Sequence, residues 1–458
     1  MDNYRQETDL IGSLNIPVSA YWGIHTERAR QNFSFSHYKV PQVLIRSLAM
    51  VKKACCIANY ELGFLERQKA QAIITACDEI MEGHLIDQFP LDALQGGAGT
   101  STNMNLNEVI ANRAIEILGG KKGNYAIVHP LHDVNLHQST NDVYPTAIKV
   151  AAIFKLRTLS EAIARLQGAF QRKEKEFASI VKIGRTELQE AVPITLGAEF
   201  AAFAEAIARD RWRTFKCEER LRVVNLGGTA VGTGLTAPRD YIFLVIEKLR
   251  EVTGLGLCRG ENVPGETANA DSFVEVSGIM KAHASNLIKI CNDLRLLNLL
   301  GEIKLPALQS GSSIMPGKVN PVLCEAAMQI GFKIMANDFL ITEATSRSTL
   351  QICEFLPLLA HAIIESMDLL INLDHVLTSH IKEITADEER CREYVDKSLT
   401  IVTALLPKIG YKQAEALVKE FLESAETSFR TFLKKRLGEK LVEEVLSPYK
   451  LTALGYRE

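Results

Sequence analysis

Four polar segments of the chain carry the side chains best suited to chemistry. They are residues 95–105, 137–142, 184–189 and 311–321, and each combines hydroxyl or amide side chains with backbone N–H groups. We expect each segment to precede a helix, where unpaired N–H groups and the helix dipole attract anions. Together the four segments can bind a dicarboxylate. For any one of them the ordinary alternative is a helix cap with its turn, because Ser, Thr and Asn are preferred capping residues.

Two further patterns look like a phosphate-binding loop and a metal site, but their residue spacing does not match either kind of site. Residues 311–318 contain two glycines and a lysine, but five residues separate the glycines instead of four, and Val319 stands where a phosphate-binding loop requires Ser or Thr. His129, His132 and His137 are spaced by three and five, so a helix does not bring all three to one face. We interpret them as polar loop histidines rather than metal ligands. The sequence predicts no cofactor and no metal ion.

The composition indicates a globular protein that acts on a small molecule. The 458 residues are 47% hydrophobic and 23% charged, and 52 basic against 55 acidic side chains give a net charge of −3. This balance does not favour a nucleic acid or an anionic membrane as partner. Nine cysteines without a CxxC pair fit a reducing compartment. No apolar run approaches the roughly 18 residues of a membrane span, so we expect a cytoplasmic protein.

Long stretches with helical spacing of apolar residues must position the polar segments. Residues 147–177 and 268–300 each carry apolar side chains at steps of three and four, which predicts two very long helices. Residues 191–223 are rich in alanine, which favours helix, and residues 321–345 and 350–377 are also helical in pattern. Strands and helices do not alternate, which disfavours a parallel α/β sheet. We predict a mainly α fold built on an elongated bundle of long helices.

The same patterns divide the chain into three expected domains. Residues 1–138 form an N-terminal region of mixed, shorter segments, and residues 139–388 form the central long-helix bundle. Residues 389–458 form a charged C-terminal helical region. The lysines and arginines of this last region alternate with apolar and acidic positions, so we interpret them as a solvated helix face rather than a binding patch.

The segment Gly311-Ser-Ser-Ile-Met-Pro-Gly-Lys-Val-Asn-Pro321 resembles the signature loop of the fumarase/aspartase superfamily. Further matching blocks cover nearly the whole chain, at residues 87–112, 138–146, 184–193, 225–234 and 291–297. The first of these blocks resembles the aspartase version rather than the fumarase version. The resemblance implies the family fold, a homotetramer whose long helices form a twenty-helix core. It also implies a small dicarboxylate substrate and active sites that are each built from three subunits.

The resemblance further implies roles for individual residues. Ser312, on a mobile loop, matches the base that removes the proton beside the β-carboxylate, and its alkoxide needs N–H donors or Lys318 to stabilise it. Thr100, Ser139 and Thr140 match the family positions that bind the aci-carboxylate. Thr186, Lys318 and Asn320 match those that bind the α-carboxylate, and Asn141 matches the contact to the leaving amine. Ser313 is a further expected substrate-binding residue.

Glu187 departs from the family pattern, since fumarases carry His there and familiar aspartases carry Gln or His. A carboxylate beside the leaving group attracts an ammonium, so we interpret Glu187 as a catalytic residue that favours an amine substrate. Glu325 is a candidate partner that shares a proton with it, with ordinary structural acidity as the even alternative. Glu190 is expected in a first helical turn. Leu136 replaces a usual Lys, and residues 297–302 are shortened.

The leading hypothesis is a reversible elimination of ammonia from L-aspartate to give fumarate, without a cofactor. The alternatives are a carbon-nitrogen lyase acting on another N-substituted succinate, a fumarate hydratase, and a catalytically inactive structural tetramer. The presence of Ser312, Lys318 and Asn320 argues against an inactive protein, although a fold alone does not determine function.

Overall fold

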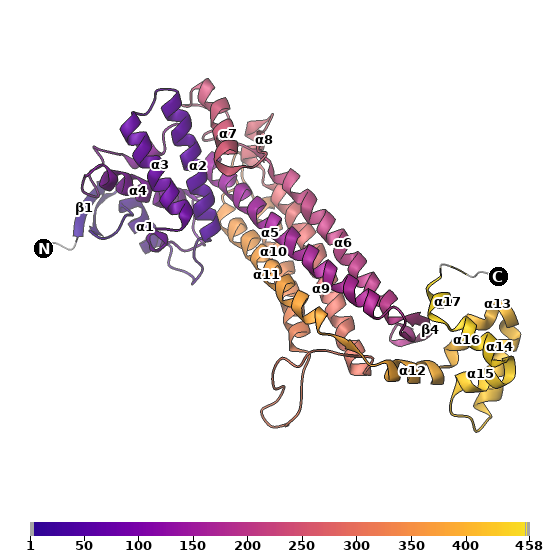
Figure 1. Ribbon diagram of the computed structural model, residues 1–458. Coiled ribbons are helices and arrows are strands. Elements are labelled where there is room, and N and C mark those ends of the chain that lie inside the picture. Colours follow the sequence, from indigo (N-terminus) through magenta and orange to yellow (C-terminus); the bar gives the residue numbers. More distant parts are fainter. Residues whose placement is uncertain (1–3, 454, 456–458) are drawn as a thin grey trace. The chain divides into compact units, whose positions relative to one another are not determined.

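The computed structural model describes residues 4–453 and 455 (Figure 1). The fold is mainly α, as predicted, and the strands of the described residues occur only as two-stranded pairs. Internal contacts divide the chain into two compact units. Unit 1 comprises Met1–Leu159, Arg213–Lys281 and Lys333–Leu369, and unit 2 comprises Ser160–Trp212, Ala282–Phe332 and Leu370–Glu458. The three-domain division at 138/139 and 388/389 stays a prediction.

Five long helices confirm the helical patterns of the sequence. They are α5 (Thr140–Glu176), α6 (Leu196–Leu221), α9 (Asp271–Leu300), α10 (Val322–Ser346) and α11 (Leu356–Lys382). The periodicity locates the start of α5 seven residues too late, because its first three residues are polar and Pro145 lies inside its second turn. The expectation of no membrane-length apolar stretch does not hold for α11, which is long and apolar enough by composition. However, 67% of its most apolar window is buried inside the protein, as in a core helix.

Unit 1 contains the shorter helices of the N-terminal half and the α7 region. Its remaining elements are β1 (Tyr4–Asp9), β2 (Gly12–Pro17), α1 (Ile24–Asn32), α2 (Gln42–Glu61), α3 (Arg67–Glu82), α4 (Thr100–Ile117), β5 (Val223–Val224), α7 (Arg239–Thr253), β6 (Cys258–Arg259) and α8 (Val263–Ala268). Strands β1 and β2 pair antiparallel, β5 and β6 pair parallel, and α2 packs against α3 and α7.

A buried carboxylate fixes the start of α1 in unit 1. Glu108 of α4 accepts hydrogen bonds from the backbone N–H groups of Gly23 and His25, both at 2.8 Å, and from the Thr26 hydroxyl at 2.5 Å. The carboxylate oxygens thus supply the acceptors that N–H groups at a helix start lack. Burial nevertheless raises the pKa of Glu108 to about 7.

Unit 2 contains a hairpin and the C-terminal helices. Its remaining elements are β3 (Val181–Thr186), β4 (Gln189–Thr195), β7 (Ile303–Lys304), β8 (Thr385–Ala386), α12 (Glu388–Lys397), α13 (Leu406–Ile409), α14 (Tyr411–Leu422), α15 (Phe429–Leu437), α16 (Glu439–Val445) and α17 (Pro448–Thr452). Both strand pairs are antiparallel. Buried Phe429, Leu433 and Val442 belong to one apolar core with Ile183 of the hairpin. This core therefore joins β3 to the C-terminal helices.

Three long helices meet at a buried histidine in unit 2. The imidazole Nδ1 of His283 on α9 lies 3.0 Å from a carboxylate oxygen of Asp210 on α6, and its Nε2 lies 3.1 Å from one of Asp374 on α11. Asn286, one turn further along α9, donates to Asp210. Burial opposes the charge of His283, but the two carboxylates outweigh it and raise its pKa to about 10. The histidine is therefore an imidazolium at neutral pH.

Candidate active site

The candidate residues fall in both units. Unit 1 carries Thr100, Ser139, Thr140 and Asn141, and unit 2 carries Thr186, Glu187, Ser312, Ser313, Lys318 and Asn320. Within each unit, the local structure determines what each side chain can do.

The first polar segment of unit 1 forms a glycine turn and the start of α4. Gly97 and Gly99 have φ of +85° and +94°, and a Cβ on Gly99 would lie 2.5 Å from the ring of Tyr144. The Gln95 amide oxygen accepts hydrogen bonds from both the N–H and the hydroxyl of Thr102, each at 3.0 Å. Thr100 is the first residue of the helix, as expected of an anion-binding N-terminus.

The second polar segment of unit 1 leads into α5 and is held by Asp142. One carboxylate oxygen of Asp142 accepts the N–H of Ser139 at 2.9 Å, and the other accepts the N–H groups of Gly227 and Thr229, both at 3.1 Å. Asp142 is fully buried, and burial raises its pKa to about 6 in spite of these three donors. The helix start that carries Ser139 and Thr140 is thus tied to the loop at 225–234.

Asn141 makes a second connection to the same loop. Its side-chain amide donates to the carbonyl of Ala230 at 2.7 Å, and its own carbonyl accepts from Asn225 at 2.9 Å. Asn225 also donates to the Thr267 hydroxyl. Two blocks that match the superfamily separately, at 138–146 and 225–234, therefore form one hydrogen-bonded structure.

A buried lysine beneath these residues was missed by the sequence reasoning. Lys52 of α2 is fully buried and donates to the side-chain oxygens of Asn135 at 2.9 Å and Gln138 at 2.8 Å. Burial lowers the pKa of Lys52 to about 8. Asn103 donates both to Asn135 and to the Thr140 hydroxyl, at 3.3 and 3.0 Å. The available signal was a lysine four residues after Leu48, on the largely apolar buried stripe of this helix.

The third polar segment does not precede a helix, contrary to the expectation. Residues 184–189 form the end of β3 and a two-residue turn, and the whole of β4 separates this turn from α6. Glu187 and Leu188 both adopt the left-handed region, with φ of 52° and 62°. Such a turn normally uses Asn-Gly or Asp-Gly, so the sequence gives no turn signal here. Thr186 and Glu187 lie exposed at this turn.

Glu190 is a strand residue, so its expected place in a first helical turn is wrong. It faces Arg185 across the hairpin and accepts a hydrogen bond from the Ser398 hydroxyl at 2.7 Å. Glu325 lies in the first turn of α10. Its coupling to Glu187 stays a prediction.

The fourth polar segment is the signature loop of unit 2, and its hydrogen bonds centre on Ser312. The Ser312 hydroxyl oxygen accepts the N–H groups of Ile314 at 3.2 Å and Met315 at 3.0 Å. The Gly311 N–H donates to the Lys318 carbonyl at 2.8 Å, and the Asn320 amide donates to the Gly311 carbonyl at 3.0 Å. These bonds close the loop on itself directly before α10.

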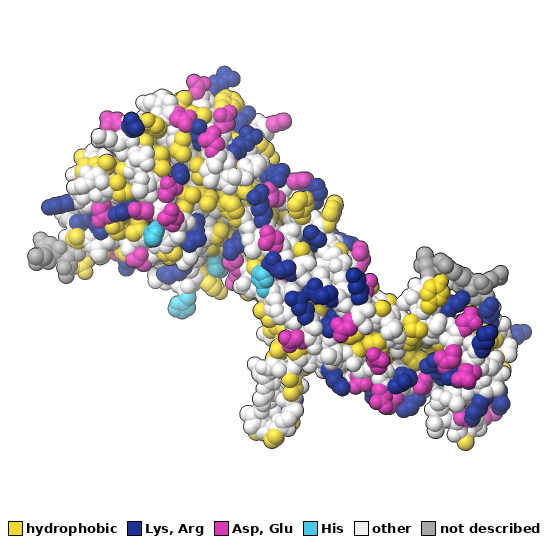
Figure 2. Space-filling view, viewed as in Figure 1, with side chains coloured by type: hydrophobic (Ala, Val, Ile, Leu, Met, Phe, Trp, Pro, Cys, Tyr) yellow, Lys and Arg dark blue, Asp and Glu magenta, His cyan; other side chains and the backbone are white. Residues whose placement is uncertain are grey.

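The tip of this loop is exposed in the isolated chain. Ile314 is 84% exposed, and Met315, Lys318 and Val319 are exposed as well. Figure 1 shows the segment between α9 and α10 as a long loop that extends away from the helices, and the same protrusion is seen in Figure 2. Among the described residues, Lys318 has no ion-pair partner, so its ammonium is available to an anion.

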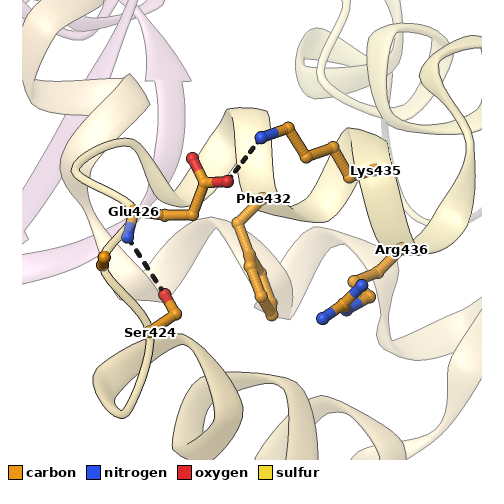
Figure 3. Close-up of a pocket in the computed structure, with 6 residues that line it drawn as sticks. Ser424, Glu426, Phe432, Lys435 and Arg436 are labelled. Atoms are coloured by element: carbon orange, nitrogen blue, oxygen red, sulfur yellow. Dashed lines mark hydrogen bonds and ion pairs between the residues drawn. The ribbon is translucent and has the colours of Figure 1, made fainter.

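A cavity in the C-terminal region involves none of the candidate residues. It has a volume of about 450 Å³ and is lined by Ser424, Ala425, Glu426, Phe432, Lys435 and Arg436 (Figure 3). Lys435 pairs with Glu426, and Arg436 pairs with Glu420. Because acidic side chains already neutralise these cations, the cavity is not a ready site for an anion. The pairing also fits the solvated helix face expected for this region.

Comparisons with known proteins identify the family. Residues 12–336 match a family described as lyase. The aspartate ammonia-lyase of Bacillus sp is 44% identical over 458 residues, which cover 98% of each chain. That of Escherichia coli K12 is 42% identical over 466 residues, which cover 100% of this chain and 98% of the relative.

Solved structures give the same result for the fold. A fumarate lyase:delta crystallin from Brucella melitensis, determined bound to cobalt, has a TM-score of 0.95 and 44% identity and covers 98% of this chain and 100% of its own. A class II fumarase from Schistosoma mansoni has a TM-score of 0.92 and 31% identity, with coverage of 98% and 99%. These matches span both units and all four polar segments. The chain therefore belongs to the lyase family, within the fumarase/aspartase superfamily.

Proposed function

We propose that this chain is an aspartate ammonia-lyase, which reversibly eliminates ammonia from L-aspartate to give fumarate. The observation that carries the proposal is the 42–44% identity, over nearly the whole chain, to several relatives that all bear this name. Glu187 supports an amine substrate, because its exposed carboxylate at the β3–β4 turn attracts an ammonium better than it serves a neutral hydroxyl.

Ser312 is the base in this proposal. It takes the proton from the carbon beside the β-carboxylate, and the electron pair left behind forms the double bond of fumarate as the C–N bond breaks. A serine hydroxyl is a weak acid, so its alkoxide needs stabilisation. The N–H groups of Ile314 and Met315, which both point at the Ser312 oxygen, are donors of the required kind.

The remaining candidates bind the substrate. Thr100, Ser139 and Thr140 contact the aci-carboxylate that develops after proton removal, and helix N-termini at α4 and α5 add positive dipole there. Thr186, Lys318 and Asn320 contact the α-carboxylate, and Ser313 lies beside the base. Asn141 and Glu187 contact the leaving amine.

The proposal includes a homotetramer in which active sites are shared between subunits. An exposed loop with Ile314, Met315 and Val319 at its tip supports this arrangement, because apolar side chains of a loop gain from cover by another chain. The partner molecule is a small dicarboxylate, without nucleic acid or membrane, and the expected compartment is the cytoplasm. The three-domain division of the subunit at 138/139 and 388/389 belongs to the same proposal.

One assay separates the candidate functions. Fumarate absorbance is followed with L-aspartate, with L-malate, with other N-substituted succinates and without substrate. Release of fumarate from L-aspartate is the expected result. Activity on malate alone would reject the proposal in favour of a hydratase, and activity on another succinate alone would favour a different carbon-nitrogen lyase. Silence with every substrate would favour an inactive structural tetramer.

A further inference from the structure

Glu302 of unit 2 is a fully buried carboxylate held between two cations. One oxygen accepts a hydrogen bond from the guanidinium of Arg185 at 2.7 Å, and the other lies 3.0 Å from the ammonium of Lys182. The side chain of Lys182 is also buried, and that of Arg185 is 16% exposed. A buried charge is tolerated only when it is paired, so these three side chains constrain each other closely.

A β-bulge of the hairpin lies between the two cations that meet this carboxylate. Lys182 and Arg185 are three residues apart, and in a regular strand such residues point to opposite faces. The pairing of β3 with β4 shifts between Ile183 and Arg185, where two residues of β4, Ala191 and Val192, stand opposite Gly184 alone. The extra residue therefore lies on β4, and the ladder is irregular between the two cations. A Cβ on Gly184 would lie 2.8 Å from the carbonyl oxygen of Val192, so the position opposite the bulge requires glycine.

Glu302 itself sits on a firmly bonded segment. Its N–H donates to the Leu297 carbonyl at 3.0 Å, and its carbonyl accepts the N–H of Asp387 at 3.0 Å. The guanidinium of Arg185 also stacks over the ring of Tyr394 at 4.9 Å, and the Tyr394 hydroxyl donates to Leu300 at 3.2 Å. The shortened segment 297–302 thus ends in the group that holds the hairpin.

The hairpin needs such an anchor because its turn is strained. Glu187 and Leu188 directly follow the end of β3, and both are in the left-handed region. For residues with a Cβ this conformation costs roughly 1–2 kcal/mol each, and it persists only where the surroundings enforce it. Arg185 lies one residue before Thr186 and two before Glu187, so its fixed position sets where the turn starts.

We propose that Glu302 is a positioning residue for the reaction. By holding Arg185, two residues before Glu187, it keeps the strained turn in place, so that Thr186 meets the substrate α-carboxylate and Glu187 meets the leaving ammonium. This inference rests on the proposed aspartate ammonia-lyase function. It goes further in that it assigns a role to a carboxylate that does not touch the substrate.

The test compares Glu302→Gln with Glu199→Gln in the full-length enzyme. Glu199 accepts a hydrogen bond from Lys182 at 2.7 Å, and the Arg185–Glu302 pair does not involve it, so it is the matched control. We expect Glu302→Gln to lower kcat/KM for L-aspartate about tenfold or more, because small displacements of positioning groups are costly to rate. Glu199→Gln should stay close to wild type. Circular dichroism and the thermal midpoint check folding of each variant.

A double variant distinguishes positioning from general stability. If Glu302 acts through the turn, Glu302→Gln combined with Glu187→Gln should lose little more activity than the worse single variant. Fully additive losses, or unchanged kcat/KM for Glu302→Gln, would overturn the inference. If Glu302→Gln does not fold, Arg185→Lys replaces it with the same expected loss, and wild-type activity in that variant would be equally decisive against the inference. A wild-type enzyme that is silent on L-aspartate would overturn the proposed function, and the inference with it.

Discussion

The buried histidine of unit 2 makes the stability of the protein depend on pH in a defined way. His283 has a pKa of about 10 between Asp210 and Asp374, against 6.5 for an ordinary histidine. This difference corresponds to at most about 5 kcal/mol of stabilisation, at about 1.4 kcal/mol per pH unit. Because the folded pKa is the higher one, the contribution is complete below pH 6.5 and is lost as pH rises toward 10.

His283→Gln removes the imidazolium but keeps a side chain that can donate to one carboxylate. The unfolding entropy of a protein is about 2.1 cal/mol/K per residue. For a chain of 458 residues that unfolds as one unit, a loss of about 1 kcal/mol in unfolding free energy therefore lowers Tm by about 1 °C. We expect the variant to melt below wild type by the largest margin at pH 6.5. The margin should narrow by about 1.4 °C per pH unit, or roughly 3–4 °C between pH 6.5 and 9.

Differential scanning fluorimetry of both proteins at several pH values between 6.5 and 9 measures this margin. Lys52 also titrates in this range, with a pKa of about 8, and the comparison with the variant cancels its effect. His84→Gln provides the control, because His84 is exposed and the same substitution there should leave Tm unchanged at every pH. A margin that is constant or widens with pH would refute the charged state of His283.

Three further predictions concern the candidate site. Ser312→Ala should keep the fold and the oligomeric state yet remove most fumarate release, and an undiminished rate would reject Ser312 as the base. Glu187→Gln should raise KM for L-aspartate without lowering Tm, whereas a change in Tm alone would count against its contact with the amine. Asp142→Asn should lower Tm by about 1–3 °C, because an amide NH2 would then face the N–H donors of Ser139 or of Gly227 and Thr229. An unchanged midpoint would show that these donors do not depend on the carboxylate.

The long helices were predictable because their apolar stripes repeat over many turns. All but the last residue of the stretch at 147–177 lies in α5, and the stretch at 268–300 contains the whole of α9. The hairpin at 181–195 was not predicted, because its turn contains neither glycine nor asparagine. Glu187 and Leu188 nevertheless adopt the left-handed region, which no local pattern of the sequence indicates.

The candidate site was found through its polar segments and their resemblance to the superfamily. The residues that support it were missed for a physical reason. Lys52 contacts Asn135 and Gln138 from more than 80 residues away, and Glu302 contacts Arg185 from 117 residues away. Spacing along the chain carries no information about such pairs. Only the unusual presence of a charged side chain in a buried stretch hints at them.

The strained turn at Glu187 and Leu188 implies a trade-off between thermal stability and catalytic activity. Leu188→Gly would relieve one left-handed residue and remove an exposed apolar side chain that is 73% accessible. Selection of variants for a higher melting temperature is therefore expected to favour substitution of Leu188. The same change would free the backbone next to Glu187, so the gain in melting temperature would come with poorer capture of the amine. Selection for thermal stability alone is thus expected to reduce catalytic activity through substitutions in the β3–β4 turn.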